Sequence, residues 1–325
     1  MPADPSPLRA DVARVDFGAC VLLCDDGSLL RATVRGRLMG PRKALGNAVV
    51  VGDRAGYEQA SDAATDAVIT EVEPRRNAFS RRAAGRQAAE QVVAANLDQV
   101  VLVTSVAEPV FSPGLADRVL CQAERAGIPA RIALNKCDLA AHQPGGDLAP
   151  AILEDYARAG YAGHAVSALS GRGLAELGKA CEGRRSLFVG HSGVGKSTLL
   201  NAMRPGLDLL AGRVNDRTGR GRHTTTAAWL LRPGPGFEVV DTPGVRAFGL
   251  WGVDPAELDQ VYPEFGPYRG ECRFADCAHQ TEPGCALRAA VEAGRIPRRR
   301  YESFLKLRDE LVADAAGAPR AGWQA

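Results

Sequence analysis

Residues 187–203, LFVGHSGVGKSTLLNAM, contain the pattern Gly190-x4-Gly195-Lys196-Ser197. This is the complete G-x4-G-K-[ST] sequence of a phosphate-binding loop. The apolar run before it predicts a β-strand and the run after it predicts a helix, which is the setting that the motif requires. Glycines allow backbone N–H groups to close around phosphate oxygens, and the N-terminus of a helix adds partial positive charge. The segment therefore predicts a nucleotide-binding domain. A chance match, the alternative, does not account for the flanking strand and helix.

The side chains of this loop indicate how the phosphates are bound. Lys196 can neutralise β- and γ-phosphate oxygens, which makes it a candidate catalytic residue, and the Ser197 hydroxyl can coordinate Mg²⁺. The residues expected to contact the nucleotide are Gly190, Ser192, Gly193, Val194, Gly195, Lys196, Ser197 and Thr198.

A second phosphate-sensing element is expected at Asp241-Thr242-Pro243-Gly244, which ends the apolar run Phe237–Val240. Asp241 can hold Mg²⁺ through water, and the Gly244 N–H can sense a γ-phosphate. Taken alone, this tetrapeptide could be an ordinary turn. Because it follows a phosphate-binding loop, we interpret it as part of a nucleotide switch.

Two further motifs predict recognition of guanine. Asn135-Lys136-Cys137-Asp138 follows the apolar run Ile132–Leu134, and the Asp138 carboxylate can accept two hydrogen bonds from guanine, a donor pair that adenine lacks. Lys136 would lie along the base and ribose. Ser167 and Ala168 end another apolar run, where a backbone N–H could reach guanine O6. Each motif alone could be a turn, but all four elements fall at strand ends, where open α/β sheets bind ligands.

A glycine-rich loop, GRGRHTTT at residues 219–226, lies between the two phosphate elements. A threonine here can complete the Mg²⁺ shell when triphosphate is bound, and we favour Thr225 over Thr224. Thr225 is therefore a candidate catalytic, nucleotide-binding and magnesium-binding residue. The motifs together predict GTP with Mg²⁺ as the ligand.

The order of the motifs is circularly permuted. The guanine-binding motifs at 135 and 167 precede the phosphate loop at 190 and Asp241, whereas ordinary GTPases begin with the phosphate loop. Permutation preserves a packed core because chain termini can move to surface loops. It also lets the Asp241–Gly244 element lead, 28 residues after Gly244, into a C-terminal segment that begins at Cys272 and could receive its movement.

That segment contains a predicted metal site of the form Cys272-x4-Cys277-x-His279-x5-Cys285. Three thiolates and one imidazole suit tetrahedral Zn²⁺, and because all four positions are filled the ion should be structural. The alternative is a scatter of free cysteines. One structural zinc ion is expected.

The composition is that of a globular protein of more than one domain. The 325 residues are 46% hydrophobic and carry a net charge of +2, so affinity for nucleic acid must come from local patches. No apolar run approaches the ~18 residues of a membrane span. The N-terminal sequence lacks an apolar signal segment, which predicts a cytoplasmic location and reduced cysteines.

The N-terminal region is expected to form a small antiparallel barrel. Turn residues separate its apolar alternating runs, which are Ala19–Cys24, Ser28–Leu38, Ala48–Val51 and Ala67–Val72. One face of the second run is basic and carries Arg31, Thr33, Arg35 and Arg37. This face suits RNA phosphates, although a merely solvated face is an equal alternative.

Four parts follow from these patterns. Residues 1–73 form the barrel, and residues 74–95 form a basic linker, partly helical. Residues 96–251 alternate strands with helices, which predicts a mostly parallel sheet covered on both faces. Residues 252–325 form the zinc-binding part, with a helix over Pro297–Ala313 and a basic stretch at 288–308 that could grip RNA.

The permuted order and several longer stretches resemble one bacterial family, the ribosome small subunit-dependent GTPase A family. The stretches are AANLDQV, NKCDL, GHSGVGKSTLLN, GRGRHTTT, DTPGVR and CRFADCAHQTEPGC. The resemblance implies an N-terminal OB-fold, a circularly permuted GTPase domain and a C-terminal zinc domain. It also implies a role in late maturation of the small ribosomal subunit, with weak GTP hydrolysis that the subunit stimulates. The expected partners are this subunit with its rRNA and GTP or GDP; we expect a monomer.

The water-orienting position is unusual. Ras-like GTPases carry glutamine after the glycine of this switch, but here the residue is Val245. The family is similar in this respect, and His223 is the matching candidate for orienting water. Contact of His223 with phosphate or rRNA is the alternative.

Two other functions remain open from the sequence. One is a zinc-containing RNA-binding scaffold that uses nucleotide only as a structural ligand. The other is a membrane-associated signalling GTPase, which the absence of a lipidation motif disfavours.

Overall fold

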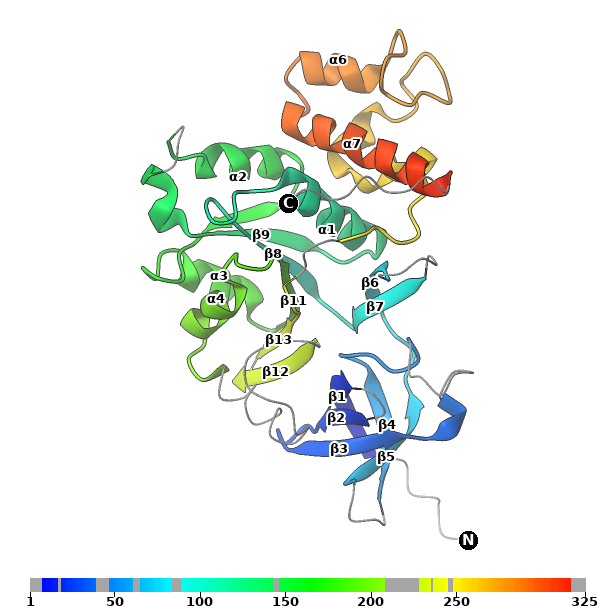
Figure 1. The fold of residues 1–325 in the computed structure, drawn as a ribbon, viewed down its shortest axis with the longest axis vertical. Helices are drawn as coiled ribbons and strands as arrows, with labels where there is room; N and C mark the ends of the chain where they lie inside the picture. The colour runs from blue at the N-terminus through cyan, green and yellow to red at the C-terminus, as the bar shows by residue number, and fades with distance from the viewer. Residues whose placement is uncertain are drawn as a thin grey trace.

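The computed structural model describes residues 8–16, 19–38, 47–60, 65–83, 89–142, 146–207, 228–234, 236–244 and 248–316. A β-barrel from the N-terminal part and a group of helices from the C-terminal part lie at opposite ends of the molecule, with a mixed sheet between them (Figure 1). The predicted multidomain α/β architecture is confirmed. Within the described residues, no helix combines the length and apolar character needed to cross a bilayer.

The N-terminal barrel is closed and has five strands in the order β1-β2-β3-β5-β4, with an OB-like arrangement. The strands are β1 (Leu8–Asp16), β2 (Ala19–Leu23), β3 (Leu29–Val34), β4 (Arg54–Gln59) and β5 (Ala67–Val72). Alternating apolar side chains, including Val12, Leu22 and Ile69, fill its interior. The prediction of a barrel is therefore correct, but the barrel is not wholly antiparallel, because β3 and β5 pair in parallel. Two of its strands, β1 and β4, were not predicted.

One predicted strand is wrong. Residues 48–51 form turns, and their valines are buried because the turn packs into the protein. The buried Asp53 carboxylate holds this turn, since it accepts hydrogen bonds from Val50 N at 2.8 Å and from Arg75 Nε at 2.7 Å. The predicted strand at 28–38 is also shorter: β3 ends at Val34, and a 3-10 turn follows at Gly36–Leu38.

The segment predicted as a partly helical linker contains a β-hairpin. Strands β6 (Ala78–Arg82) and β7 (Glu90–Ala95) pair in an antiparallel manner, so the helix expected in this segment is absent from its described residues. Phe79 anchors the hairpin, because its buried ring lies 5.6 Å from the ring of Phe248.

The central sheet has the order β10-β9-β8-β11-β13-β12. Its parallel strands are β8 (Gln99–Ser105), β9 (Ala130–Asn135), β10 (Ala162–Ala165), β11 (Arg184–Gly190) and β13 (Phe237–Asp241). The edge strand β12 (Trp229–Gly234), which was not predicted, runs antiparallel to β13. Helices α1 (Pro113–Arg125) and α2 (Ala149–Arg158) lie on one face, and α3 (Leu174–Cys181) and α4 (Lys196–Met203) lie on the other (Figure 1). The mostly parallel, doubly covered sheet is as predicted.

The C-terminal part is helical and has its own aromatic core. It comprises the 3-10 segments η3 (Pro255–Val261) and η4 (Pro263–Tyr268) and the helices α6 (Ala286–Glu292) and α7 (Arg298–Ala315). The rings of Tyr262, Phe265 and Phe304 pack together, with centroids 4.9–5.3 Å apart. One member of the predicted RNA-binding stretch, Arg300, is fully buried among Asp117, Glu264 and three tyrosine rings, so it is not available to RNA.

Candidate functional site

The four predicted nucleotide-binding elements meet at one edge of the central sheet. Strands β9, β10, β11 and β13 are parallel, so their carboxyl ends share an edge. The Asn135–Asp138, Ser167–Ala168, phosphate-loop and Asp241–Gly244 elements each follow one of these strands. The fold therefore brings together residues that lie more than a hundred positions apart in the sequence.

The phosphate loop requires glycine for reasons visible in its packing. Gly195 has a φ of +86° and precedes the first residue of α4. A Cβ at this position would lie 2.6 Å from Asn135 Nδ2, and one at Gly190 would lie 2.2 Å from the Val103 carbonyl oxygen. The backbone at Gly190 and Gly195 therefore lies too close to β8 and to Asn135 of β9 for a side chain at either position.

Asn135 is a cross-link between two loops. Its buried side chain donates from Nδ2 to the Val194 carbonyl oxygen at 2.9 Å and accepts at Oδ1 from Ala168 N at 3.1 Å. The phosphate loop and the predicted guanine-binding loop are thus tied to each other through one amide. The sequence placed Asn135 at the ligand site, and the structure adds this supporting role.

The phosphate loop is also joined to the Asp241–Gly244 element. Lys196 Nζ forms an ion pair with Asp241 Oδ1. The adjacent Thr242 hydroxyl donates to the Phe188 carbonyl oxygen at 2.8 Å, and a Cβ on Gly244 would lie 2.8 Å from Ser192 Cα. Both phosphate elements are therefore packed together, while Ser197 and Thr198 are exposed in the first turn of α4.

The predicted guanine-binding motif has a defined backbone shape. Lys136 adopts a φ of +61°, and Cys137 N donates to the Val166 carbonyl oxygen at 3.1 Å. This bend places Asp138, which is half-buried, near the start of the 3-10 segment η2 (Cys137–His142). On the adjoining loop, the buried Ser167 Oγ accepts from Ser170 N at 3.0 Å, which fixes the turn that presents Ala168.

The loop after β8 belongs to this site and was missed from the sequence. Lys136 Nζ donates to the Glu108 carbonyl oxygen, and Ser105 Oγ donates to the Pro109 carbonyl oxygen at 2.6 Å. A Cβ on Gly193 would lie 3.6 Å from Pro109 Cδ, so this loop adjoins the phosphate loop. The available signal was topological, because every loop after a parallel strand reaches the same edge.

Three predicted residues, Thr225, His223 and Val245, lie outside the described residues.

The C-terminal cysteines and histidine converge as predicted. One potential ligand atom from each of Cys272, Cys277, His279 and Cys285 lies within 4.8 Å of the others. Nδ1 of His279 is 3.6 Å from Cys272 Sγ and 3.4 Å from Cys285 Sγ. A cluster of three thiols and one imidazole has the donor chemistry of a closed tetrahedral zinc site, so these residues can hold a metal ion.

Glu282, which the sequence did not suggest, shapes the loop that carries His279. Its carboxylate accepts hydrogen bonds from the backbone N–H groups of Ala278, Gln280 and Thr281 at 2.8–3.0 Å. Backbone hydrogen bonds lower the pKa of Glu282 below its ordinary value. Tyr301 of α7 donates to the His279 carbonyl oxygen at 2.6 Å, so the loop is held from both sides.

The fold and site together define a circularly permuted P-loop GTPase preceded by a barrel and followed by a metal-binding helical part. The model of the RsgA GTPase family matches residues 72–251. The chain is 43% identical to the small ribosomal subunit biogenesis GTPase RsgA of Gemmatimonas aurantiaca, over 91% of this chain and 94% of that one. It is 42% identical to the protein of the same name from Chlorobaculum tepidum, over 94% of this chain and 98% of the relative.

Solved structures agree with these relatives. YjeQ from Thermotoga maritima is similar with a TM-score of 0.70 and 32% identity, covering 94% of this chain and 98% of that one. YloQ, described as a circularly permuted GTPase, is similar with a TM-score of 0.69 and 26% identity, covering 99% of each chain. The chain belongs to the RsgA GTPase family and is a hydrolase that acts on GTP.

Proposed function

We propose that this GTPase binds the small ribosomal subunit and assists its late maturation, and that the subunit stimulates GTP hydrolysis. The relatives' names refer to small-subunit biogenesis, and the similarity extends along nearly the whole chain. The observation that supports the proposal is the position of the central sheet, whose edge carries the candidate nucleotide site, between a barrel and a helical part that both expose arginines (Figure 1).

Each residue of the nucleotide site has a distinct proposed role. Lys196 would stabilise charge on the β- and γ-phosphates, and Ser197 would coordinate Mg²⁺. Asp241 would hold the same ion through water, while the Gly244 N–H would contact the γ-phosphate. Asp138 would select guanine. The ion pair between Lys196 and Asp241 supports this assignment, because it brings a phosphate-binding cation and a magnesium-binding anion to the same point.

Hydrolysis in the isolated protein should be slow. Val245 is apolar at the position where a glutamine orients water in Ras-like proteins. We propose that docking on the subunit brings His223 near the attacking water and Thr225 to Mg²⁺. Stimulation would then come from positioning and electrostatics, without a new covalent step.

Contact with rRNA would be electrostatic. Arg31 on the barrel is exposed, and so are Arg295, Arg298 and Lys306 in the C-terminal part. Arg35 is exposed as well, although its guanidinium pairs with Glu58 at 2.9 Å. These groups could bind phosphates from both ends of the molecule, and affinity for the subunit should then fall steeply with salt.

We further propose one structural zinc ion at the cluster of Cys272, Cys277, His279 and Cys285, and Mg²⁺ bound with GTP. The four parts are proposed to act as domains over residues 1–73, 74–95, 96–251 and 252–325. The proposed form is a cytoplasmic monomer.

Phosphate release under multiple turnover tests the function. The full chain should release phosphate slowly alone and much faster with purified small subunits, whereas large subunits should have no effect. His223→Ala should bind GTP and the subunit but lose most of the stimulation. Equal rates under all three conditions would contradict the ribosomal role. A complete absence of turnover would favour the scaffold that holds nucleotide only as a structural ligand.

A further inference from the structure

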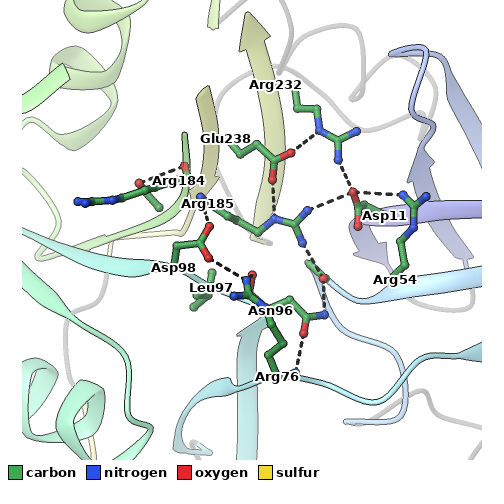
Figure 2. Close-up of polar contacts among 12 residues, drawn as sticks. Asp11, Arg54, Arg76, Asn96, Leu97, Asp98, Arg184, Arg185, Arg232 and Glu238 are labelled. Carbon is green, nitrogen blue, oxygen red and sulfur yellow. Dashed lines mark hydrogen bonds and ion pairs between the residues drawn. The ribbon is translucent and has the colours of Figure 1, made fainter. Parts of the chain in front are cut away.

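Strand β1 of the barrel contacts the central sheet through a buried carboxylate. Asp11 Oδ2 accepts from Arg185 Nη2 at 3.1 Å and from Arg232 Nη2, and it lies 3.6 Å from Arg54 Nη1 (Figure 2). The Asp11 side chain is only 5% exposed. One carboxylate from the barrel therefore meets guanidinium groups from β11 and β12 of the sheet, in addition to one from β4.

A second carboxylate closes this network on the side of the sheet. Glu238 of β13 pairs with Arg185 Nε at 2.6 Å and with Arg232 Nε at 2.7 Å (Figure 2). Burial by itself would raise the pKa of Glu238, but the two arginines outweigh it and hold the pKa below its ordinary value. Arg185 and Arg232 also donate to the Gly52 and Cys24 carbonyl oxygens of the barrel, so each guanidinium bridges both parts.

A separate contact lies at the start of β12. The guanidinium carbon of Arg14, on β1, is 4.3 Å from the ring centroid of Trp229, and both side chains are buried. Arg14 is held in place by Asp16, whose carboxylate lies 2.8 Å from its Nε. Strand β1 thus contacts β12 at two places, through Asp11 with Arg232 and through Arg14 with Trp229.

Strands β12 and β13 connect these two contacts to the candidate nucleotide site. Trp229 pairs with Asp241 in the antiparallel ladder between β12 and β13. Glu238 lies three positions before Asp241 on β13. Asp241 begins the loop whose Gly244 packs on Ser192 of the phosphate loop. A displacement of β1 relative to the sheet would therefore shift the residues proposed to sense Mg²⁺ and γ-phosphate.

We propose that Asp11 and Arg14 are positioning residues that couple the barrel to Asp241 and Gly244 through β12 and β13. A ligand that moves the barrel changes the fit of the site to triphosphate, and by reciprocity triphosphate changes the affinity of the barrel for that ligand. The identity of the ligand, rRNA of the small subunit, rests on the proposed function. The coupling itself is a property of the chain alone.

The sharpest test compares nucleotide affinities of the isolated full chain, with Mg²⁺ present. GDP and a non-hydrolysable GTP analogue are titrated against wild type, Asp11→Asn, Arg14→Met and Asp25→Asn. Asp25 is the matched control, because it pairs with the same Arg54 yet is 70% exposed. Asp11→Asn and Arg14→Met should bind the analogue about fivefold or more weakly and leave GDP within about twofold, whereas Asp25→Asn should change neither.

A double variant tests whether the coupling passes through the contact between Asp11 and Arg232. Arg232→Gln alone should reproduce the loss of Asp11→Asn, and the combination should lose little more than either single change, since both remove the same contact. An equal loss for both nucleotides, or the same loss in Asp25→Asn, would overturn the coupling.

Hydrogen exchange on the wild type provides a measurement independent of whether the variants fold. Amides of β1 and β12 should be better protected with the analogue than with GDP, and identical protection would contradict the proposal. A final arm measures stimulation of phosphate release by small subunits. Wild type without stimulation would count against the proposed function, while the affinities and the exchange data would still decide the coupling.

Discussion

The ammonium group of Lys196 forms an ion pair with the carboxylate of Asp241, and this contact joins the phosphate loop to the loop that follows β13. The two residues are 45 positions apart in the sequence. In the proposed mechanism this ion pair breaks when GTP binds. Lys196 then contacts the phosphates, and Asp241 contacts the Mg²⁺ ion through water. The pair therefore holds a cation and an anion close to where the phosphates and Mg²⁺ would bind, so that little rearrangement is needed when GTP binds.

Replacing Lys196 by alanine should abolish most of the catalysis. The variant loses a charge that stabilises the transferring phosphoryl group, so turnover should fall by about 10²–10³-fold with or without subunits. Phosphate release measures the effect. Lys179→Ala, on the exposed surface of α3, is the control and should behave as wild type. Normal turnover in Lys196→Ala would remove this residue from the proposed mechanism.

Asp138→Asn should change the preferred base. The variant loses two hydrogen bonds from guanine to a carboxylate, which corresponds to about 10²-fold or more in GTP affinity. An asparagine N–H can instead bind the 2-oxo group of xanthine, so affinity for xanthosine triphosphate should rise. Titration with both nucleotides measures the change. Unaltered GTP affinity would show that residues 135–138 do not read the base.

The metal cluster should bind about one zinc ion per chain, because it offers one closed set of four ligands. Cys277→Ala and His279→Ala should lose the ion, and the C-terminal part should loosen while nucleotide affinity persists. Elemental analysis and protease sensitivity measure the two effects. Cys181→Ala, at a buried position of α3, is a control that should retain zinc. Protein purified without chelator and found free of zinc would refute the assignment.

Removal of Arg300 should strongly destabilise the junction between the sheet and the C-terminal helices. Its guanidinium and the Asp117 carboxylate are both 0% exposed, and Glu264 pairs with it from η4. Arg300→Ala leaves two buried carboxylates without a cation, which should cost about 3–5 kcal/mol of unfolding free energy. Arg298→Ala, exposed on the same helix, should cost less than about 0.5 kcal/mol. Denaturant unfolding compares them, and similar losses would contradict this account.

The contribution of Glu238 to stability should depend on pH. Arg185 and Arg232 outweigh burial and hold its pKa in the folded chain below the ordinary 4.5. A lowered folded pKa means that the stabilisation is complete above the ordinary pKa and is lost as pH falls through the folded value. Wild type should therefore be more stable than Glu238→Gln by about 1–3 kcal/mol at neutral pH.

That difference should shrink as the pH falls below 4.5. Unfolding by denaturant at several pH values measures it, with the exposed Glu302→Gln as the control. A difference that does not change between neutral and acidic pH would contradict the assigned ion pairs.

Local sequence patterns predicted the elements around the candidate nucleotide site, because strand, loop and helix follow one another directly in that part of the chain. The structure has helix α4 directly after the phosphate loop, as predicted, and α7 starts and ends within two residues of the predicted Pro297–Ala313. The wrong strand at 48–51 shows the limit of this reasoning. An apolar run indicates burial, and these valines are buried in a turn held by Asp53, three positions after Val50, which in turn pairs with Arg75, 22 positions further along the chain.

The sequence by itself determined the chemistry of this protein. The predicted phosphate binding, guanine recognition and metal coordination depend on residue types at short, fixed spacings, and the permuted order can be read directly along the chain. Only the tertiary structure decided which charges act together. Arg300, which reads as part of a basic surface, is buried against Asp117, and Asp11 of the barrel meets Arg185 and Arg232 of the sheet. Such partners lie 174 to 221 positions apart, and their contacts depend on how whole strands and helices pack, which no local pattern encodes.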